Sequence, residues 1–473
     1  MKTDYNRLFF IRLFENTEFE VFSPPTGILS IISYLRKIIK DLDIVLYDMV
    51  LEGDSVQALY KKIRDKDPDI ILFSLTYLER DMFFKTSQTL RTRFPEKIFI
   101  AGGPGVSSNP LEFLRPDCTD YIVQAEGEFR TVEIIRALRE KREVSLDGIG
   151  FFKDNEKVFR TASTYIEDLD EIGFPAWDMT DLQRFSGLPN LNSMLKGRKY
   201  AQVITSRGCP YSCPYCQNSY LTGSVRHRKR SVQSIIKELD YLKSIGVDEI
   251  HFLDDTFNIP EDRALSILDA IARRKYGFYV AFQGIRMEKI TPRILNKMKK
   301  AGTYKIEFGI QHVAPDIVSQ TGRTGPNALR IIRSNIKTAK KLNILTCAYF
   351  IYGFPGETLR HSELNLKEAL KTGSDMAAFL KLIPLPGTEY FSMLDSPGNI
   401  PSSQYNFYNN SEHLTLSEYS ADKLKDIQKY SYKKYYTHNL RIIRTVLRLP
   451  WNLYWLRIFL HQYIRDIFAL FFR

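Results

Sequence analysis

Cysteine is scarce in this chain, which has five in 473 residues. Three of the five are crowded between residues 209 and 216, so the spaced pairs of a disulfide framework are missing. Long apolar runs are missing too, since no stretch approaches the roughly 20 uncharged residues that a membrane-spanning helix needs. The N-terminus, with Asp4 ahead of a short apolar run, does not make a secretory signal. These absences predict a protein of the reducing cytoplasm.

Patterns that would identify other ligands are also missing. Neither phosphate-binding glycine motif, G-x-G-x-x-G or G-x-x-x-x-G-K-[ST], occurs in the chain. Histidine is absent ahead of His227. The formal net charge is +12, but the basic residues are scattered for most of the length, as on an ordinary solvated surface. We therefore expect no nucleic-acid partner.

The first third of the chain alternates short apolar runs with segments of helical periodicity. Such alternation predicts a doubly wound, five-stranded parallel sheet, an α/β domain that we place at residues 1–145. A chain of this length holds two or three domains. The predicted strands are Leu8–Ile11, Ile44–Tyr47, Ile70–Phe73, Ile98–Ala101 and Tyr121–Val123.

Small and polar residues follow these strands where an open parallel sheet binds ligands, beyond the carboxyl ends. Small side chains there allow a large flat ligand to approach the backbone, although a glycine after a strand is also an ordinary helix-entry turn. The candidate ligand-binding residues are Pro24, Thr26, Gly27, Ser74, Thr76, Gly102, Gly103, Glu126 and Gly127.

Residues 146–195 read as a hairpin and a linker. Short apolar stretches here flank the turn residues Lys153–Asn155, and Phe174–Trp177 leads toward the next domain.

The segment Ser206–Cys216 holds Cys209, Cys213 and Cys216 on one turn-rich loop after the predicted strand 202–205. Three thiolates at this spacing can each bind a different iron of a cubic cluster and leave one iron open. A structural zinc site needs four protein ligands, and His227 could supply the fourth. Unpaired core cysteines are a third interpretation, but prolines and tyrosines between them fit a core poorly.

The spacing C-x-x-x-C-x-x-C, with Tyr215 directly before the third cysteine, resembles the radical S-adenosylmethionine (SAM) superfamily. The resemblance implies a 4Fe-4S cluster on the three cysteines, with SAM bound at the open iron. It also implies cleavage of SAM to a 5′-deoxyadenosyl radical by one electron from a donor such as flavodoxin or ferredoxin. The cofactor supplies the difficult chemistry, and the protein positions and shields it.

The resemblance continues through five further strand–helix units, which imply a partial (β/α)6 barrel over residues 196–390 with its site at the carboxyl ends of the strands. The acidic pair Asp254–Asp255 follows the second strand, and Gly353 lies in a glycine-rich turn after the fifth. The segment Leu382–Thr388 matches the sixth unit. By resemblance the SAM-binding residues are Tyr215, Asp254, Asp255, Arg286, Gln311 and Gly353, with Gln311 standing where many relatives carry Glu.

An open sheet ahead of such a barrel resembles the cobalamin-binding branch of the superfamily, which includes the anaerobic magnesium-protoporphyrin monomethyl ester cyclase and radical SAM methyltransferases. The resemblance implies cobalamin in the first domain. The motif D-x-H-x-x-G is missing; Asp48–Gly53 has its spacing with Val50 in place of histidine, but it follows the second strand. A methylthiotransferase would need three more cysteines in this domain, where only Cys118 occurs. Cys347 reads as a small buried residue within a strand.

Residues 391–473 lack the barrel pattern and read as helical, with Leu414–Asn439 rich in lysine and tyrosine. Beyond them arginines alternate with aromatic residues. This pattern suits a helix in a membrane interface, and equally a terminal helix packed on the barrel. The residues are Arg441, Arg444, Arg448, Arg457 and Arg465 with Trp451, Tyr454, Trp455, Phe459, Tyr463, Phe468, Phe471 and Phe472.

Together these features predict a radical SAM enzyme that methylates an unactivated carbon with cobalamin. A cobalamin-dependent cyclisation or oxidative ring formation is the second hypothesis. A non-catalytic protein that binds zinc or a cluster is the rival from another class. Membrane contact through the C-terminal segment would favour a lipid-like substrate over another small molecule.

Overall fold

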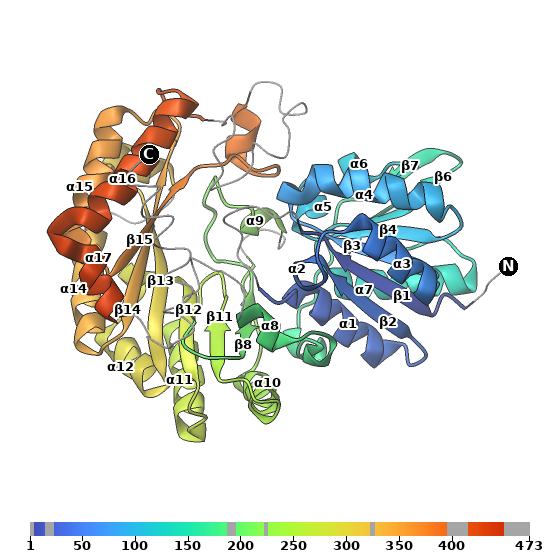
Figure 1. Cartoon of the computed structure of the whole chain (residues 1–473), viewed down its shortest axis with the longest axis horizontal. Helices are drawn as coiled ribbons and strands as arrows, with labels where there is room; N and C mark the ends of the chain where they lie inside the picture. Colours follow the sequence, from blue (N-terminus) through green and yellow to red (C-terminus); the bar gives the residue numbers. More distant parts are fainter. Residues whose placement is uncertain are drawn as a thin grey trace.

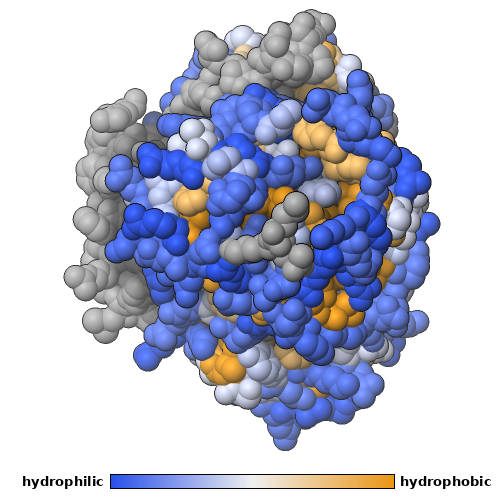
Figure 2. Space-filling view, turned by 90° about the vertical axis from the view of Figure 1, so that its right-hand side faces the viewer, coloured by the Kyte–Doolittle hydropathy of each residue, from blue (hydrophilic) through white to orange (hydrophobic). Residues whose placement is uncertain are grey.

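The computed structural model describes residues 4–14, 23–186, 195–221, 226–321, 327–394 and 415–448. Two α/β units lie side by side, each built on its own sheet (Figure 1). The side formed by the first unit presents a mainly hydrophilic surface with smaller hydrophobic areas between (Figure 2).

The first sheet has seven strands in the order β2-β1-β3-β4-β5-β6-β7. Its first five strands are parallel, which confirms the predicted sheet. The predicted hairpin at Lys153–Asn155 also forms, and it extends the same sheet with two antiparallel strands. The strands are β1 (Arg7–Arg12), β2 (Asp43–Asp48), β3 (Ile70–Ser74), β4 (Ile98–Gly102), β5 (Tyr121–Val123), β6 (Ile149–Lys153) and β7 (Glu156–Phe159).

Helices cover both faces of this sheet because side chains alternate along each strand. On β1, Phe9 and Ile11 pack into one apolar core, whereas Leu8 and Phe10 pack into another on the opposite face. The doubly wound arrangement is therefore confirmed. The helices are α1 (Thr26–Ile38), α2 (Met49–Glu52), α3 (Val56–Lys66), η1 (Tyr77–Glu79), α4 (Arg80–Arg93), α5 (Pro104–Ser108), α6 (Pro110–Phe113) and α7 (Gly127–Glu140).

The second sheet has six parallel strands in the chain order β8-β11-β12-β13-β14-β15, as a partial barrel requires. The sixth strand ends at Lys381, so the segment Leu382–Thr388, predicted as the sixth unit, follows the strand instead of forming it. The strands are β8 (Tyr200–Val203), β11 (Glu249–Phe252), β12 (Tyr279–Ile285), β13 (Thr303–Gln311), β14 (Leu345–Tyr352) and β15 (Met376–Lys381).

The barrel helices pack on the outer face of this sheet, where they form the largest apolar core of the chain. Ile250 and Phe252 of β11 lie in that core, whereas Glu249 and His251 project to the other face. The helices are α10 (Val232–Ser244), α11 (Glu261–Arg274), α12 (Pro292–Lys300), α14 (Ala328–Lys341) and α15 (Leu359–Thr372).

Short elements connect the two units and form the loops around the barrel. They are η2 (Leu169–Glu171), η3 (Trp177–Met179), α8 (Leu182–Ser186), β9 (Ser206–Arg207), α9 (Asn218–Leu221), β10 (Arg228–Lys229), η4 (Met287–Lys289), α13 (Pro315–Gln320) and η5 (Glu389–Met393).

The C-terminal helix α16 (Ala421–Thr437) confirms the helix predicted at Leu414–Asn439. It packs beside β15, where Gln428 Nε2 donates a 2.6 Å hydrogen bond to the Phe379 carbonyl. The turn η8 (His438–Leu440) and the helix α17 (Arg441–Arg448) follow it. Residues 449–473, which hold most of the arginine–aromatic pattern, lie outside the described residues. Among the described helices, none is long and apolar enough to cross a bilayer.

Candidate functional site

The cysteine loop begins directly after β8, and Asp254 fixes that beginning. This buried carboxylate accepts hydrogen bonds from Thr205 N (3.0 Å), Thr205 Oγ1 (2.8 Å) and Ser206 Oγ (2.5 Å). Burial raises the pKa of Asp254. Its other oxygen, Oδ2, is buried without a hydrogen-bond partner among the described residues, so it is available to a ligand.

Asp255 holds the loop at both of its ends. Its Oδ2 accepts from Gly208 N at 3.1 Å, and its Oδ1 accepts from Asn218 Nδ2 at 2.5 Å. Burial, with Asp254 alongside, raises the pKa of Asp255 to about 6. The acidic pair was predicted to bind SAM. The structure gives both carboxylates a role in shaping the cysteine loop, and their contact with SAM stays a prediction.

Cys209, Cys213 and Cys216 are half-buried on this loop, and none is in a disulfide. Thr256 Oγ1 lies 3.8 Å from Cys209 Sγ, and burial raises the pKa of Cys216 to about 11. No three histidine, cysteine or acidic side chains of the described residues converge as ligands of one metal ion. A cubic cluster takes one thiolate at each iron, so its cysteines surround the ligand instead of meeting at a point. Three free cysteines on one loop are the donor set that such a cluster needs.

Tyr215, the aromatic residue before the third cysteine, packs into an aromatic group at the barrel edge. Its ring lies 5.6 Å from Phe354 and 6.3 Å from Tyr390. Tyr390 N also donates to the Pro214 carbonyl at 3.4 Å. Burial raises the pKa of Tyr390 to about 12, and its hydroxyl is buried without a partner among the described residues. Tyr390 was not predicted from the sequence, although it lies directly after Leu382–Thr388, which resembles the sixth barrel unit.

Arg286, predicted to bind SAM, stacks on the cysteine loop. Its guanidinium carbon lies 4.0 Å from the ring centroid of Tyr211, and its Nε donates to Glu288 at 2.5 Å. The side chain is buried. Arg286 therefore supports the loop from the third barrel strand, whatever else it contacts.

Gln311 and Gly353 lie at the ends of neighbouring strands, both with left-handed backbone (φ +69° and +97°). This conformation is costly for a residue other than glycine, so Gln311 is a strained position of the kind found at functional sites. Its Oε1 is buried without a hydrogen-bond partner among the described residues. Gly353 N donates to Glu357 at 2.6 Å, which fixes the glycine-rich turn. The structure thus supplies a polar group for a ligand at Gln311.

The first domain contacts the cysteine loop through charged residues. Arg207, two residues before Cys209, donates to Glu128 Oε1 at 2.5 Å and to Glu126 Oε1 at 2.9 Å. Ser30 of α1 shares Glu128, at 2.8 Å. Arg228 reaches both oxygens of Glu126 at 2.9 Å. Glu126 was predicted to bind the first-domain ligand, and the structure shows its carboxylate paired with two arginines. The pairing of Arg207 with Glu128 was not predicted, because it spans the two domains.

Four of the remaining predicted ligand residues of the first domain fall into two groups, one packed and one accessible. Gly103 and Gly127 are packing positions, since a Cβ atom would lie 2.7 Å from the Leu75 carbonyl oxygen and 2.7 Å from Ile31 Cδ1, respectively. Gly27 has open space beside it, and Thr76 is exposed. The first group closes the loops, and the second leaves an accessible edge. The other predicted residues are buried Pro24 and half-buried Thr26, Ser74 and Gly102.

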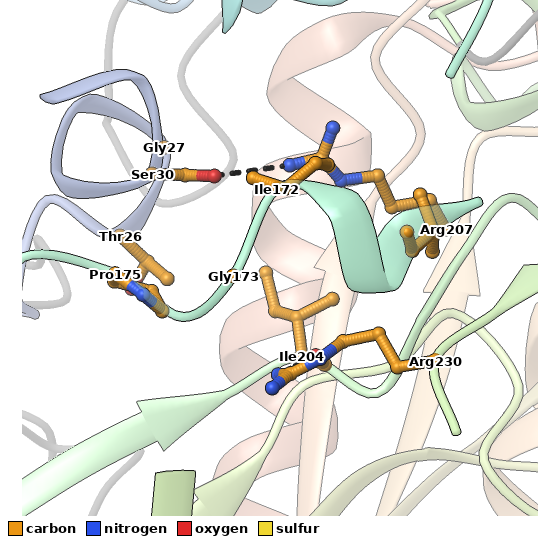
Figure 3. Close-up of a pocket in the computed structure, with 10 residues that line it drawn as sticks. Thr26, Gly27, Ser30, Ile172, Gly173, Pro175, Ile204, Arg207 and Arg230 are labelled. Carbon is orange, nitrogen blue, oxygen red and sulfur yellow. Dashed lines mark hydrogen bonds between the residues drawn. The ribbon is translucent and has the colours of Figure 1, made fainter. Parts of the chain in front are cut away.

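A small cavity lies where α1 meets the second domain, with Thr26, Gly27 and Ile204 in its lining (Figure 3). Its volume is about 60 Å³, whereas pockets for organic ligands reach roughly 300–1,000 Å³. Arg207 crosses it to Ser30 at 3.2 Å. The cavity has room for water but not for a corrinoid.

The inner face of the barrel carries a buried polar group that the sequence did not indicate. Lys305 Nζ lies 2.8 Å from Glu307 Oε1, and Tyr349 donates to the same carboxylate. Cys347, predicted as a buried apolar residue, is half-buried beside this group. Burial, with Glu307 nearby, raises the pKa of its thiol.

His227, the alternative zinc ligand, lies in cationic surroundings. Burial, together with Lys229 and Arg263, lowers the pKa of His227 to about 4. Neighbouring positive charges oppose a bound metal cation as they oppose a proton. The electrostatics therefore disfavour the zinc interpretation.

Comparison with known proteins supports the cysteine site. Residues 203–366 match the family model of the radical SAM superfamily. A protein described as an uncharacterized methyltransferase, from Pyrococcus horikoshii, is 28% identical over 431 residues, covering 89% of this chain and 90% of its own. The anaerobic magnesium-protoporphyrin IX monomethyl ester cyclase of Rubrivivax gelatinosus is 24% identical, covering 81% of this chain and 69% of its own.

Among solved structures, the radical enzyme OxsB with aqua-cobalamin bound superposes with a TM-score of 0.72 at 16% identity. The superposition covers 98% of this chain and 72% of OxsB, so the likeness extends to the whole fold. The chain is a radical SAM protein, with relatives among methyltransferases and anaerobic magnesium-protoporphyrin cyclases.

Proposed function

We propose that this radical SAM enzyme methylates an unactivated carbon with the help of cobalamin. The observation that carries the proposal is the contact of the first domain with the cysteine loop, through Arg207 and Glu128. In addition, α5 lies against α9, which begins two residues after Cys216. A ligand at the accessible edge of the first sheet would thus lie close to the cluster.

The bound cofactors would supply a 5′-deoxyadenosyl radical, to remove a hydrogen atom from the substrate. They would also supply a methyl group, to bond to the carbon radical left on the substrate. The chain's own part is to bind and orient them. Cys209, Cys213 and Cys216 hold the cluster, and Asp255 fixes the loop that presents them. Gln311 Oε1 and Asp254 Oδ2 offer buried acceptors to the polar groups of SAM.

The first domain suits a cobalamin that takes no ligand from the protein. It has no histidine, so no imidazole of this domain can bind the cobalt. The exposed edge at Gly27 and Thr76 offers backbone and hydroxyl groups, which suit the amide side chains of a corrinoid. The likeness to OxsB, whose structure contains aqua-cobalamin, supports this assignment.

The substrate would enter the barrel, whose inner face carries Lys305, Glu307 and Tyr349. These groups could recognise a polar part of a small-molecule or lipid-like substrate. The reducing electron would come from a flavodoxin or a ferredoxin.

Two measurements test the proposal. First, the anaerobically purified protein is mixed with hydroxocobalamin and passed through gel filtration. We expect stoichiometric retention of cobalamin, and its complete loss would refute the cobalamin assignment. Second, metabolites and lipids of cells with and without the gene are compared by mass spectrometry after labelling with methyl-deuterated methionine. We expect a product that is lost with the gene and carries the labelled methyl group.

Ring formation is the second candidate, because the cyclase relative matches 81% of this chain. The same metabolite comparison separates the two reactions. Methylation adds a deuterium-labelled methyl group to the substrate, whereas oxidative ring formation adds no label. An unlabelled product with fewer hydrogens than its substrate would therefore replace the methylation proposal.

A further inference from the structure

The helix α17 packs against the barrel through its polar side chains. Thr445 Oγ1 donates to the Asp375 carbonyl at 2.7 Å, and Arg441 Nη2 donates to the Leu370 carbonyl at 2.9 Å. Arg448 pairs with the Asp375 carboxylate. These residues recur at intervals of four and three, so they share one face of the helix. The contacts of α17 with the barrel thus include three polar side chains, beside which Ile442 is half-buried.

Three other large apolar side chains of this segment are exposed. Leu440 is 64% exposed, Ile443 51% and Leu447 73%. Ile443 and Leu447 are each two residues, or about 200°, from buried Thr445, which places them on the opposite face. A surface helix of a water-soluble domain ordinarily turns its apolar face to the core. Here Leu440, Ile443 and Leu447 instead form an exposed apolar face, which would be stabilised by an apolar environment.

The charged side chains of α17 itself are all positive. Arg444 is exposed beside Ile443 and Leu447, and no aspartate or glutamate occurs from Ile427 to Arg465 in the sequence. On the preceding helix, Tyr430 is 58% exposed, with exposed Lys433 and Lys434 one turn after it and exposed Asp426 one turn before it. In sequence, the residues after Arg448 continue the pattern with Trp451, Tyr454, Trp455 and Arg457.

We propose that Leu440, Ile443, Arg444 and Leu447 form a docking face for the surface of an anionic lipid bilayer. Apolar side chains enter the boundary between headgroups and acyl chains, while arginine and lysine bind lipid phosphates. Lipid fits better than another protein, because the face joins apolar side chains to cations without any acidic residue. Nucleic acid fits worst, since large apolar side chains gain nothing against phosphates.

The place of the docking face in the fold is compatible with activity at a membrane. The helices α16 and α17 lie at one end of the molecule, and the first domain lies at the other (Figure 1). A bilayer at α17 therefore leaves the first domain and its edge toward the cysteine loop uncovered. The inference does not depend on which reaction the enzyme catalyses.

The test is co-sedimentation of the full-length protein with vesicles, using phosphatidylcholine alone or phosphatidylcholine mixed with phosphatidylglycerol. We expect binding to the anionic vesicles that weakens as salt rises, and at least about tenfold weaker partition for Ile443→Glu/Leu447→Glu. Leu111→Glu, which alters a leucine in the first domain that is 46% exposed against 51% for Ile443, is the control and should bind as wild type. Arg444→Gln should weaken binding to anionic vesicles only.

Three outcomes would overturn the proposal. The first is absence of binding by the wild type, and the second is equal binding by the double variant. The third is a wild type that ignores vesicles but self-associates in gel filtration through Ile443 and Leu447, which would make the face an interface between copies. Cluster content and SAM cleavage of each variant are measured in parallel. Both should stay unchanged, because α17 is not part of the cysteine loop or of the predicted SAM site.

Discussion

Arg207 and Glu128 join the two domains at the cysteine loop. The guanidinium stands two residues before Cys209, and the carboxylate lies in the first turn of α7, 2.5 Å away. Burial pushes the pKa of Glu128 upward, but Arg207 and Ser30 together hold that pKa below its ordinary value. The pair therefore stays ionised at neutral pH. It fixes the cluster-binding loop relative to the first domain.

Replacing Glu128 with Gln should destabilise the protein. It leaves Glu126 as the one carboxylate paired with Arg207 among the described residues, so we expect the free energy of unfolding to fall by about 2–3 kcal/mol, at or below the range for breaking a buried pair. Thermal unfolding should therefore begin several degrees lower. Glu156→Gln, at an exposed position of β7, is the control. An unchanged unfolding temperature for Glu128→Gln would show that the pair does not hold the domains together.

Asp255→Ala should impair the cysteine loop, because it removes both acceptors that close it. We expect cluster content after anaerobic reconstitution to fall several-fold, and Asp255→Asn, which keeps one acceptor oxygen, to fall less. Asp262→Ala removes an exposed carboxylate on α11 and serves as the control. Iron and sulfide analysis measures the outcome. Wild-type cluster content in Asp255→Ala would show that the hydrogen bonds of Asp255 to Gly208 and Asn218 are not needed to form the cysteine loop.

Alanine substitutions at Gly353 and Gly356 distinguish an effect of backbone strain from an effect on ligand binding. Both have positive φ, so an alanine at either position should cost about 1–3 kcal/mol of stability. A Cβ at Gly356 meets open space, whereas at Gly353 it lies 3.2 Å from Leu424 Cδ2. Only Gly353→Ala should also raise the KM for SAM. An equal effect of the two variants on KM would remove Gly353 from the predicted SAM site.

His227 should make stability depend on pH. Its pKa is about 4 in the folded chain and about 6.5 when unfolded, so the unfolded state binds the proton more readily. Stability should then be complete above about pH 6.5 and fall as pH decreases toward 4, by about 1–3 kcal/mol from this group. His227→Gln should flatten that part of the denaturant-melting profile, with His438→Gln as the control. An unaltered profile would contradict the shifted pKa.

The five parallel strands of the first domain followed from local pattern, because a buried parallel strand needs a short apolar run and each run there stands between helical segments. The barrel strands followed from the family resemblance, except that the sixth is Met376–Lys381 and not Leu382–Thr388. The cysteine site followed from spacing within one loop. Contacts across the chain were not visible in the sequence. Tyr390 reaches the loop from beyond the last strand, and the pairing of Arg207 with Glu128 depends on how two domains meet. The exposed apolar face of α17 could not be predicted either, because the sequence pattern does not tell which side of the helix packs on the barrel.

We predict above all that Cys209, Cys213 and Cys216 hold a cluster that cleaves SAM. The most direct measurement is anaerobic reconstitution with iron and sulfide, followed by absorption spectroscopy and assay of 5′-deoxyadenosine formed from SAM under reduction. We predict 4Fe-4S absorption and 5′-deoxyadenosine for the wild type, and neither for Cys213→Ala. A colourless protein that holds zinc, or a Cys213→Ala variant that retains both properties, would contradict the account.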